Sequence, residues 1–167
     1  MDASEFQQFG SSTPKFSLVG INTFARFIGN YDGDTCTLVI PVHGQHYKFN
    51  VRLLGIDTCE IKSKNAKCKE LAIQARNRVF QLATSCDFDN KWTRKQLAAA
   101  MDATVHMVWI ECSDMDKYGR PLVRMFTPTD RALSFQDTLI AEKLAYSYDG
   151  AAKMTEEQQV NQLTKDE

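Results

Sequence analysis

The segment from Thr23 to Leu54 restricts the fold of this chain more than any other part of the sequence. It contains three stretches rich in β-branched and aromatic residues, with only short turns between them. One of these stretches, Thr35 to Val42, reads TCTLVIPV and is followed by the turn residues His43-Gly44-Gln45. Connections this short join strands that lie side by side and run antiparallel. The segment therefore predicts a meander of three strands.

The part of the chain that follows the meander predicts helices and two further strands. Apolar residues between 71 and 83 recur on one helical stripe, and residues 134–144 also indicate a helix. Residues 105–110 and 122–126 have the composition of strands. Three strands, a helix, two strands and a helix is the order found in small five-stranded Greek-key barrels of the OB type. Strands this short would also fit an open α+β sheet.

A chain of 167 residues fits one domain with tails better than two domains. We expect an N-terminal arm over residues 1–20, a domain over 21–150, and a polar C-terminal tail or short helix over 151–167. Residues 85–103 lack a clear strand pattern and read as an insertion into the domain, in which residues 94–101 could form a short helix.

Composition and charge exclude several classes of protein. With 43% hydrophobic and 25% charged residues, the chain can bury a core and is not a disordered tail. A net charge of −1 excludes a protein that holds nucleic acid through overall basicity. No apolar window is long enough to span a membrane. The first residues lack the basic and apolar regions of a secretory signal, so we expect an intracellular protein, cytoplasmic or nuclear, in a cellular or a viral setting.

The cysteines and histidines predict neither disulfides nor a zinc site. The five cysteines are odd in number and contain no C-x-x-C pair, which favours free thiols. His43 and His46 form an H-x-x-H, but they flank a turn and have no cysteine partners nearby. The tip of a hairpin is the favoured interpretation of this pair.

Three short charged clusters stand beside predicted turns, at residues 32–35 (DGDT), 52–60 (RLLGIDTCE) and 116–120 (DKYGR). Taken singly, each is typical of a turn or a surface ion pair. Taken together, they offer Asp34 and Asp57 as hard oxygen ligands suited to Ca²⁺ or Mg²⁺. A loop carbonyl near these aspartates, such as that of Thr58, could add a third ligand.

The same clusters supply the remaining groups that a phosphodiesterase needs. Glu60 would be placed to orient or deprotonate a water molecule. Arg52 and Arg120 could clamp a phosphate with forked, charge-assisted hydrogen bonds. A metal ion, a carboxylate base and two guanidinium groups are what the hydrolysis of a phosphodiester requires, because its transition state gathers negative charge.

In this order and placement, the three clusters resemble those of the staphylococcal (thermo)nuclease family, which reads D-G-D-T, then R-L-L-x-x-D-T-P-E, then D-K-Y-G-R. The likeness runs from about Phe24 to Tyr148. It implies a mainly β protein with α-helices, a five-stranded Greek-key OB-fold β-barrel with two to three packed helices. It also implies a Ca²⁺-dependent nuclease that acts on DNA and/or RNA, with single strands favoured, and leaves 3′-phosphate ends. Mg²⁺ or another divalent cation is an alternative cofactor. Neither a membrane nor a protein partner is indicated.

The resemblance assigns roles residue by residue. It implies catalytic roles for Arg52, Glu60 and Arg120. It implies metal ligands at Asp34, Asp57 and the main-chain oxygen of Thr58, with Asp32 in the outer environment of the metal. It implies substrate contacts at Lys117 and Tyr118, beside the phosphate, and at Tyr146 and Tyr148, which would line the nucleotide pocket.

The chain departs from the family pattern at a few places. Cys59 stands where the family has proline, so we expect the loop that holds Glu60 to be less rigid. Residues 61–78 contain six basic side chains and one acidic one, and this stretch could guide a nucleic-acid strand. Residues 121–167 carry an excess of acidic side chains instead.

Two other interpretations compete with an active nuclease. The first is an OB-fold nucleic-acid-binding module that has lost catalysis; the presence of every predicted carboxylate and arginine argues against it. The second is a protein-interaction scaffold that uses residues 85–103, for which the sequence gives no positive evidence.

Overall fold

The computed structural model describes residues 2–165 of the chain. Met1, Asp166 and Glu167, at the outer ends of the predicted arm and tail, lie outside the described residues.

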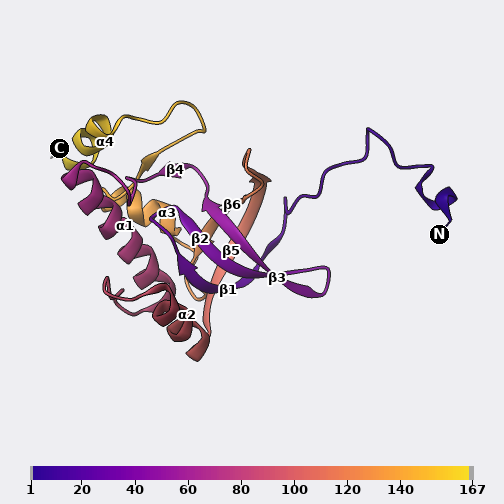
Figure 1. The fold of residues 1–167 in the computed structure, drawn as a ribbon, viewed down its shortest axis with the longest axis horizontal. Coiled ribbons are helices and arrows are strands. Elements are labelled where there is room, and N and C mark those ends of the chain that lie inside the picture. Colours follow the sequence, from indigo (N-terminus) through magenta and orange to yellow (C-terminus); the bar gives the residue numbers. More distant parts are fainter. Residues whose placement is uncertain (1, 166–167) are drawn as a thin grey trace.

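Five strands close into a barrel in the spatial order β1-β2-β3-β6-β5 (Figure 1). Strands β1, β2 and β3 form the predicted meander, strand β3 runs parallel to β6, and β5 pairs antiparallel with both β1 and β6. The strands are β1 (Asn22–Asn30), β2 (Thr35–Val42), β3 (Gln45–Leu53), β5 (His106–Met115) and β6 (Pro121–Phe126). The closed barrel confirms the predicted OB-type fold and excludes the open α+β sheet.

The barrel interior follows from alternation along the strands. In β2, Cys36, Leu38, Ile40 and Val42 are buried, and the residues between them are only partly covered. Successive side chains of a strand point to opposite faces, so this spacing directs one apolar face into the barrel. Strand β5 is longer than the predicted 105–110, because it continues as a polar ribbon that leads into the β5–β6 turn.

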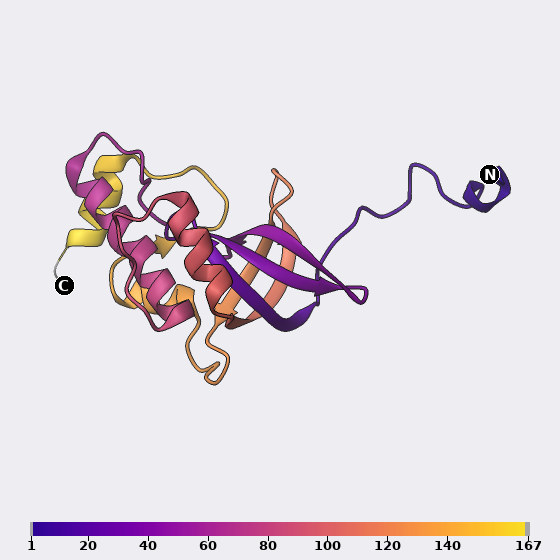
Figure 2. The ribbon, with the colours of Figure 1, turned by 60° about the horizontal axis from the view of Figure 1, so that its bottom comes forward.

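Four α-helices occur among residues 2–165, where the sequence predicted two to three packed helices. They are α1 (Ala66–Thr84), α2 (Arg94–Ala103), α3 (Phe135–Ala141) and α4 (Glu156–Thr164). The fourth, α4, packs against α1, although its sequence EEQQVNQLT offers few apolar residues. Its start is fixed by a capping box between Thr155 and Gln158. The helices gather around one end of the barrel, and the N-terminal arm leaves from the opposite end (Figures 1 and 2).

The stretch 85–103 joins the hydrophobic core rather than standing apart from it. Phe88 and Trp92 pack edge-to-face on Phe80 of α1, with ring centroids 5.1 and 6.0 Å away. Met101 of α2 is buried. The ring contacts hold the segment before α2 on the long helix α1, and α2 itself packs against strand β1.

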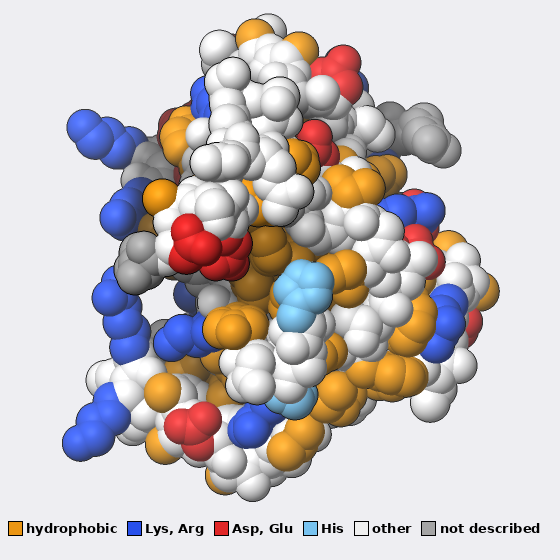
Figure 3. Space-filling view, turned by 90° about the vertical axis from the view of Figure 1, so that its right-hand side faces the viewer, with side chains coloured by type: hydrophobic (Ala, Val, Ile, Leu, Met, Phe, Trp, Pro, Cys, Tyr) orange, Lys and Arg blue, Asp and Glu red, His pale blue; other side chains and the backbone are white. Residues whose placement is uncertain are grey.

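The N-terminal arm contains one short 3-10 helix, Ala3–Phe6, and is exposed until Leu18, which is buried. Its side chains Phe6, Phe9 and Phe16 remain more than half exposed. On the face seen in Figure 3, hydrophobic side chains occupy much of the centre, and Lys and Arg side chains gather along one edge. Within residues 2–165, none of the helices has the length and apolar character needed to cross a membrane.

Gly33 lies where the β1–β2 turn meets α1. A Cβ atom at this position would come 2.6 Å from the Cβ of Ala75 and 2.9 Å from Cγ2 of Thr58. Both distances are shorter than any relaxed carbon–carbon contact, so only glycine allows the turn to pack this closely on the helix.

We expect Gly33→Ala to lower the free energy of unfolding by about 1–3 kcal/mol, because α1 or the turn must move away. Chemical denaturation measures this change. Gly10→Ala is the matched control, since nothing lies within 4 Å of its added Cβ. Equal stability of the two variants would contradict the packing argument.

Candidate functional site

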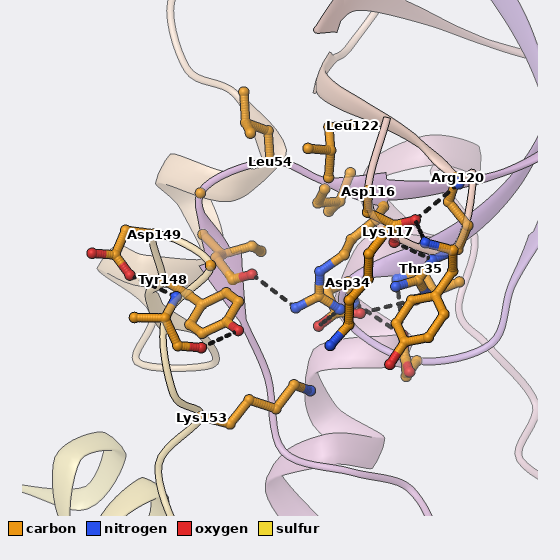
Figure 4. Close-up of a pocket in the computed structure, with 18 of the residues that line it drawn as sticks. Asp34, Thr35, Leu54, Asp116, Lys117, Arg120, Leu122, Tyr148, Asp149 and Lys153 are labelled. Carbon is orange, nitrogen blue, oxygen red and sulfur yellow. Dashed lines mark hydrogen bonds and ion pairs between the residues drawn. The ribbon is translucent and has the colours of Figure 1, made fainter. Parts of the chain in front are cut away.

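The three charged clusters, far apart in the sequence, meet at one cleft of about 890 Å³ (Figure 4). The β1–β2 turn, the end of β3, the β5–β6 turn and the segment that follows β7 (Tyr146–Ser147) form its walls. Predicted site residues that line the cleft are Asp32, Asp34, Arg52, Glu60, Lys117, Tyr118, Arg120 and Tyr148. Asp57, Thr58 and Tyr146 are buried.

Arg52 joins the two aspartates that the sequence predicts as metal ligands. Its Nη1 forms an ion pair with Oδ2 of Asp34 over 2.9 Å, and its Nη2 donates a hydrogen bond to Oδ1 of Asp57 over 2.6 Å. The strand register explains this arrangement, because Arg52 lies opposite Thr35, next to Asp34. Asp57 belongs to the short strand β4 (Ile56–Asp57), just beyond the end of β3. The side chains of Asp34 and Asp57 are 5% and 0% exposed, so one guanidinium holds two buried carboxylates.

The buried carboxyl group of Asp34 has a raised pKa. Burial and the nearby carboxylate of Asp32 raise the pKa of Asp34 to about 7, although Arg52 acts in the opposite direction. Thr35 donates a hydrogen bond to Oδ1 of Asp34 over 2.9 Å. Asp32 shapes the turn, because its Oδ1 accepts hydrogen bonds from the main-chain N–H groups of Asp34 and Thr35.

Asp57 has more partners than Asp34. Tyr146 donates its hydroxyl to Oδ2 over 2.5 Å, and the Nζ of Lys153 lies 2.9 Å from Oδ1. Burial alone would raise the pKa of Asp57, but the hydrogen bonds from Tyr146, Lys153 and Arg52 outweigh it and lower the pKa. Tyr146 also accepts a hydrogen bond from Gln159 of α4. The side chain of Tyr146 therefore supports Asp57 from within the protein and does not line the cleft.

Glu60 is the most exposed of the predicted catalytic side chains. It is 53% exposed, and its Oε1 lies 3.1 Å from the Nζ of Lys153. Lys153 lies in the polar segment before α4 and belongs to none of the three clusters. The sequence reasoning missed it, since a single lysine in a polar segment gives no signal of its own.

The β5–β6 turn directs Arg120 toward the first cluster. Oδ1 of Asp116 accepts hydrogen bonds from the main-chain N–H groups of Tyr118 and Arg120, and Oδ2 accepts one from Nε of Arg120 over 2.6 Å. Nη1 of Arg120 lies 3.4 Å from the hydroxyl of Thr35. Asp116 was not predicted as a site residue, although its four-residue spacing from Arg120 could have indicated this contact.

Two tyrosines border the cleft, one exposed and the other half-buried. Tyr118 is 73% exposed, and Lys117 and Arg120 lie over its ring at 5.2 and 5.6 Å. Tyr148 lies on the other side of the cleft, where its hydroxyl donates to the carbonyl of Ala151 (Figure 4). Arg52 is 5.8 Å from the centre of the Tyr148 ring.

A family model for staphylococcal nuclease homologues matches residues 50–167, which is more than half of the chain. The chain belongs to this family. A search of curated proteins finds no match. The matched region contains the second and third clusters, and the structure adds the first by pairing Asp34 with Arg52. Membership of the family indicates a nuclease or a nucleic-acid-binding domain.

The family implies Ca²⁺, and the charges around Asp34 and Asp57 indicate whether the site of this staphylococcal nuclease homologue fits that ion. Around Asp34 and Asp57, four carboxylic side chains, Asp32, Asp34, Asp57 and Glu60, share the two cations that pair with them, Arg52 and Lys153. A divalent cation would supply the positive charge that this cluster lacks. Burial is the main cause that raises the pKa of Asp34, and the carboxylate of Asp32 adds to it. Between residues 2 and 165, no three His, Cys, Asp or Glu side chains converge to hold a metal ion. Two carboxylates with main-chain and water oxygens suit a partly hydrated Ca²⁺ or Mg²⁺, so the residues fit the ion.

We expect Asp34→Asn to stabilise the metal-free homologue. The folded protein keeps the proton of Asp34 up to about pH 7, whereas the unfolded chain loses it near the ordinary aspartate pKa of 3.8. Stability is therefore lost in the native protein as the pH rises between these values. The advantage of Asp34→Asn should grow from about pH 4, reaching roughly 1–3 kcal/mol above pH 7.

Urea unfolding in chelator at several pH values measures this advantage. Asp102→Asn, an exposed aspartate on α2, is the control and should change the free energy of unfolding by less than about 0.5 kcal/mol. A destabilised Asp34→Asn at pH 8 would contradict the argument.

We expect Tyr146→Phe to lower the free energy of unfolding by about 1.5–3 kcal/mol at pH 7, because a hydrogen bond to a buried carboxylate is lost. This bond helps to lower the pKa of Asp57, so the difference from the native protein should shrink at acid pH, where Asp57 becomes protonated. Tyr118→Phe is the matched control on an exposed ring. The same loss in both variants would contradict the role of Tyr146.

Proposed function

We propose that this staphylococcal nuclease homologue is a divalent-cation-dependent nuclease, with Ca²⁺ as the preferred ion, that hydrolyses phosphodiester bonds of DNA and/or RNA. One observation carries the proposal. Asp34, two arginines and an exposed glutamate, which come from three separate clusters of the sequence, line one open cleft, and Arg52 joins Asp34 there to the buried Asp57. A purely structural ion-pair network would not require an accessible carboxylate and a half-exposed lysine at its edge.

In this proposal, Asp34, Asp57 and the main-chain oxygen of Thr58 hold the cation. Bound there, a divalent cation would polarise the scissile phosphate and make water more acidic. Asp32 keeps the turn that carries Asp34 in place, and Tyr146 keeps Asp57 in place.

The remaining groups act on the substrate. Arg52 and Arg120 donate hydrogen bonds to the non-bridging oxygens of the phosphate, where negative charge increases in the transition state. Glu60 accepts a proton from the attacking water. The water oxygen bonds to phosphorus while the bond from phosphorus to the 5′-oxygen breaks. The leaving 5′-oxygen takes up a proton from solvent, so the products carry a 3′-phosphate and a 5′-hydroxyl.

The aromatic borders of the cleft favour single strands as substrate. Bases can stack on the exposed ring of Tyr118, or on the half-buried ring of Tyr148 at the cleft wall, only when they are unpaired. Lys117 lies beside Tyr118 and would contact the phosphate backbone.

The basic stretch 61–78 contributes less than its charge suggests. Arg78 pairs with Glu142 over 2.6 Å, and Arg76 lies over the ring of Phe88 at 4.3 Å. Guidance of the strand would therefore depend on the exposed lysines Lys62, Lys64 and Lys69.

We expect the purified protein to cleave single-stranded DNA or RNA in Ca²⁺ and to lose this activity in chelator. Glu60→Gln should lower the rate by about 10²–10⁴-fold, because the general base is lost. Glu60 is mostly exposed, so this variant should keep its stability. Arg120→Ala should also lower the rate strongly. Arg52→Ala is less informative, because it leaves two buried carboxylates without their shared partner.

A gel assay with end-labelled substrate measures both the rate and the 3′-phosphate ends. Arg94→Ala, an exposed arginine on α2, is the control and should cleave as the native protein does. Cleavage that survives the chelator, or that is unchanged in Arg120→Ala, would refute the mechanism. Salt-sensitive binding without any cleavage would instead identify a nucleic-acid-binding module.

A further inference from the structure

Lys153 places an ammonium group between two carboxylates of the site. Its Nζ lies 2.9 Å from Oδ1 of Asp57 and 3.1 Å from Oε1 of Glu60. In Figure 4 its side chain points into the cleft from the segment that precedes α4. None of the three sequence clusters contains this residue, and the resemblance to the family assigns it no role.

The segment that carries Lys153 is anchored on both sides. Before it, the main-chain N–H of Tyr148 donates to the carbonyl of Gly55, and the hydroxyl of Tyr148 donates to the carbonyl of Ala151. After it, Gln159 of α4 donates to the carbonyl of Met154 over 3.3 Å. The ammonium is therefore presented to the site by a segment that is held in place, rather than by a loose tail.

Of the three partners of Asp57, Lys153 is the one that can leave most easily. Tyr146 and Arg52 are largely buried, whereas the side chain of Lys153 is 44% exposed on a flexible four-carbon stem. An ammonium is a compact point charge, and it interacts with carboxylate oxygens in the same electrostatic way as a metal cation.

We propose that Lys153 is a built-in counter-cation that competes with the divalent cation for Asp57 and thereby sets the metal affinity of the site. This proposal rests on the metal-dependent function proposed above. In the metal-free protein, the ammonium balances part of the excess negative charge around Asp57 and Glu60. When the divalent cation binds, the ammonium leaves Oδ1 of Asp57 and swings toward solvent.

Calorimetric titration of the chelator-treated full-length protein with CaCl₂ tests the proposal. We expect Lys153→Met to bind Ca²⁺ at least about fivefold more tightly than the native protein, because the competing charge is gone. Lys153→Arg keeps the charge and should bind within about twofold of the native protein. Lys62→Met is the matched control, because it removes the same charge from an exposed position two residues beyond Glu60. It should also bind within about twofold.

Thermal unfolding gives a second readout that does not depend on activity. Without metal, Lys153→Met should unfold at a lower temperature than the native protein, because Asp57 and Glu60 lose a counter-charge. Added Ca²⁺ should raise the midpoint more in Lys153→Met than in the native protein, since tighter binding stabilises the folded state more. Lys153→Gln repeats the charge removal with a polar side chain, and circular dichroism checks that each variant is folded.

Several results would overturn the proposal. One is an unchanged Ca²⁺ affinity in both Lys153→Met and Lys153→Gln. Another is a gain in Ca²⁺ affinity in Lys62→Met or in Lys153→Arg that is as large as the gain in Lys153→Met. The last is the absence of Ca²⁺ binding by every variant. The cleavage assay judges the nuclease function separately. A native protein that cleaves while the variants show no gain in affinity refutes only the role of Lys153. A native protein that does not cleave while Lys153→Met binds Ca²⁺ more tightly refutes only the nuclease.

Discussion

The fork of Arg52 between Asp34 and Asp57 is the interaction on which the rest of the site depends. Two carboxylates with almost no exposure would repel each other and lose their hydration, so one guanidinium between them makes their burial tolerable. The contacts of Arg52 also determine which oxygen atoms of Asp57 are left for its other partners. Tyr146 can reach only the second oxygen of Asp57, and Lys153 must share the first with Arg52.

This arrangement links the barrel to the helices. Arg52 lies one residue before the end of strand β3, and Tyr146 and Gln159 connect Asp57 to β7 and α4. Helix α1 presses on the β1–β2 turn through Ala75 and Gly33. These packed elements supply the stability that offsets the burial of Asp34, which raises the pKa of this carboxyl group.

Much of the fold could be predicted from the sequence, because local patterns of apolar residues and short turns specify most of the strands and helices. The alternation in TCTLVIPV and the short turn after it determine β2 and its hairpin, and the apolar stripe of residues 71–83 determines the centre of α1. Helix α4 was predicted only as a tail or short helix, since it buries few apolar residues, Leu163 and part of Val160, and its place is set by contacts with α1 and by its capping box. The pairing of β3 with β6 joins residues about seventy positions apart, and no local pattern specifies it.

For the site, the sequence by itself determined which chemical groups are present: carboxylates, arginines and tyrosines grouped in three turns. Only the tertiary structure decided how they are used. Tyr146 and Tyr148 look alike in the sequence, but one is buried against Asp57 and the other borders the cleft. Lys153 belongs to no motif, yet the segment before α4 places it between Asp57 and Glu60. The physical reason is that burial and charge pairing depend on distances between residues that are remote along the chain. Closure of the barrel, the pairing of β4 with β7 and the packing of α4 set those distances.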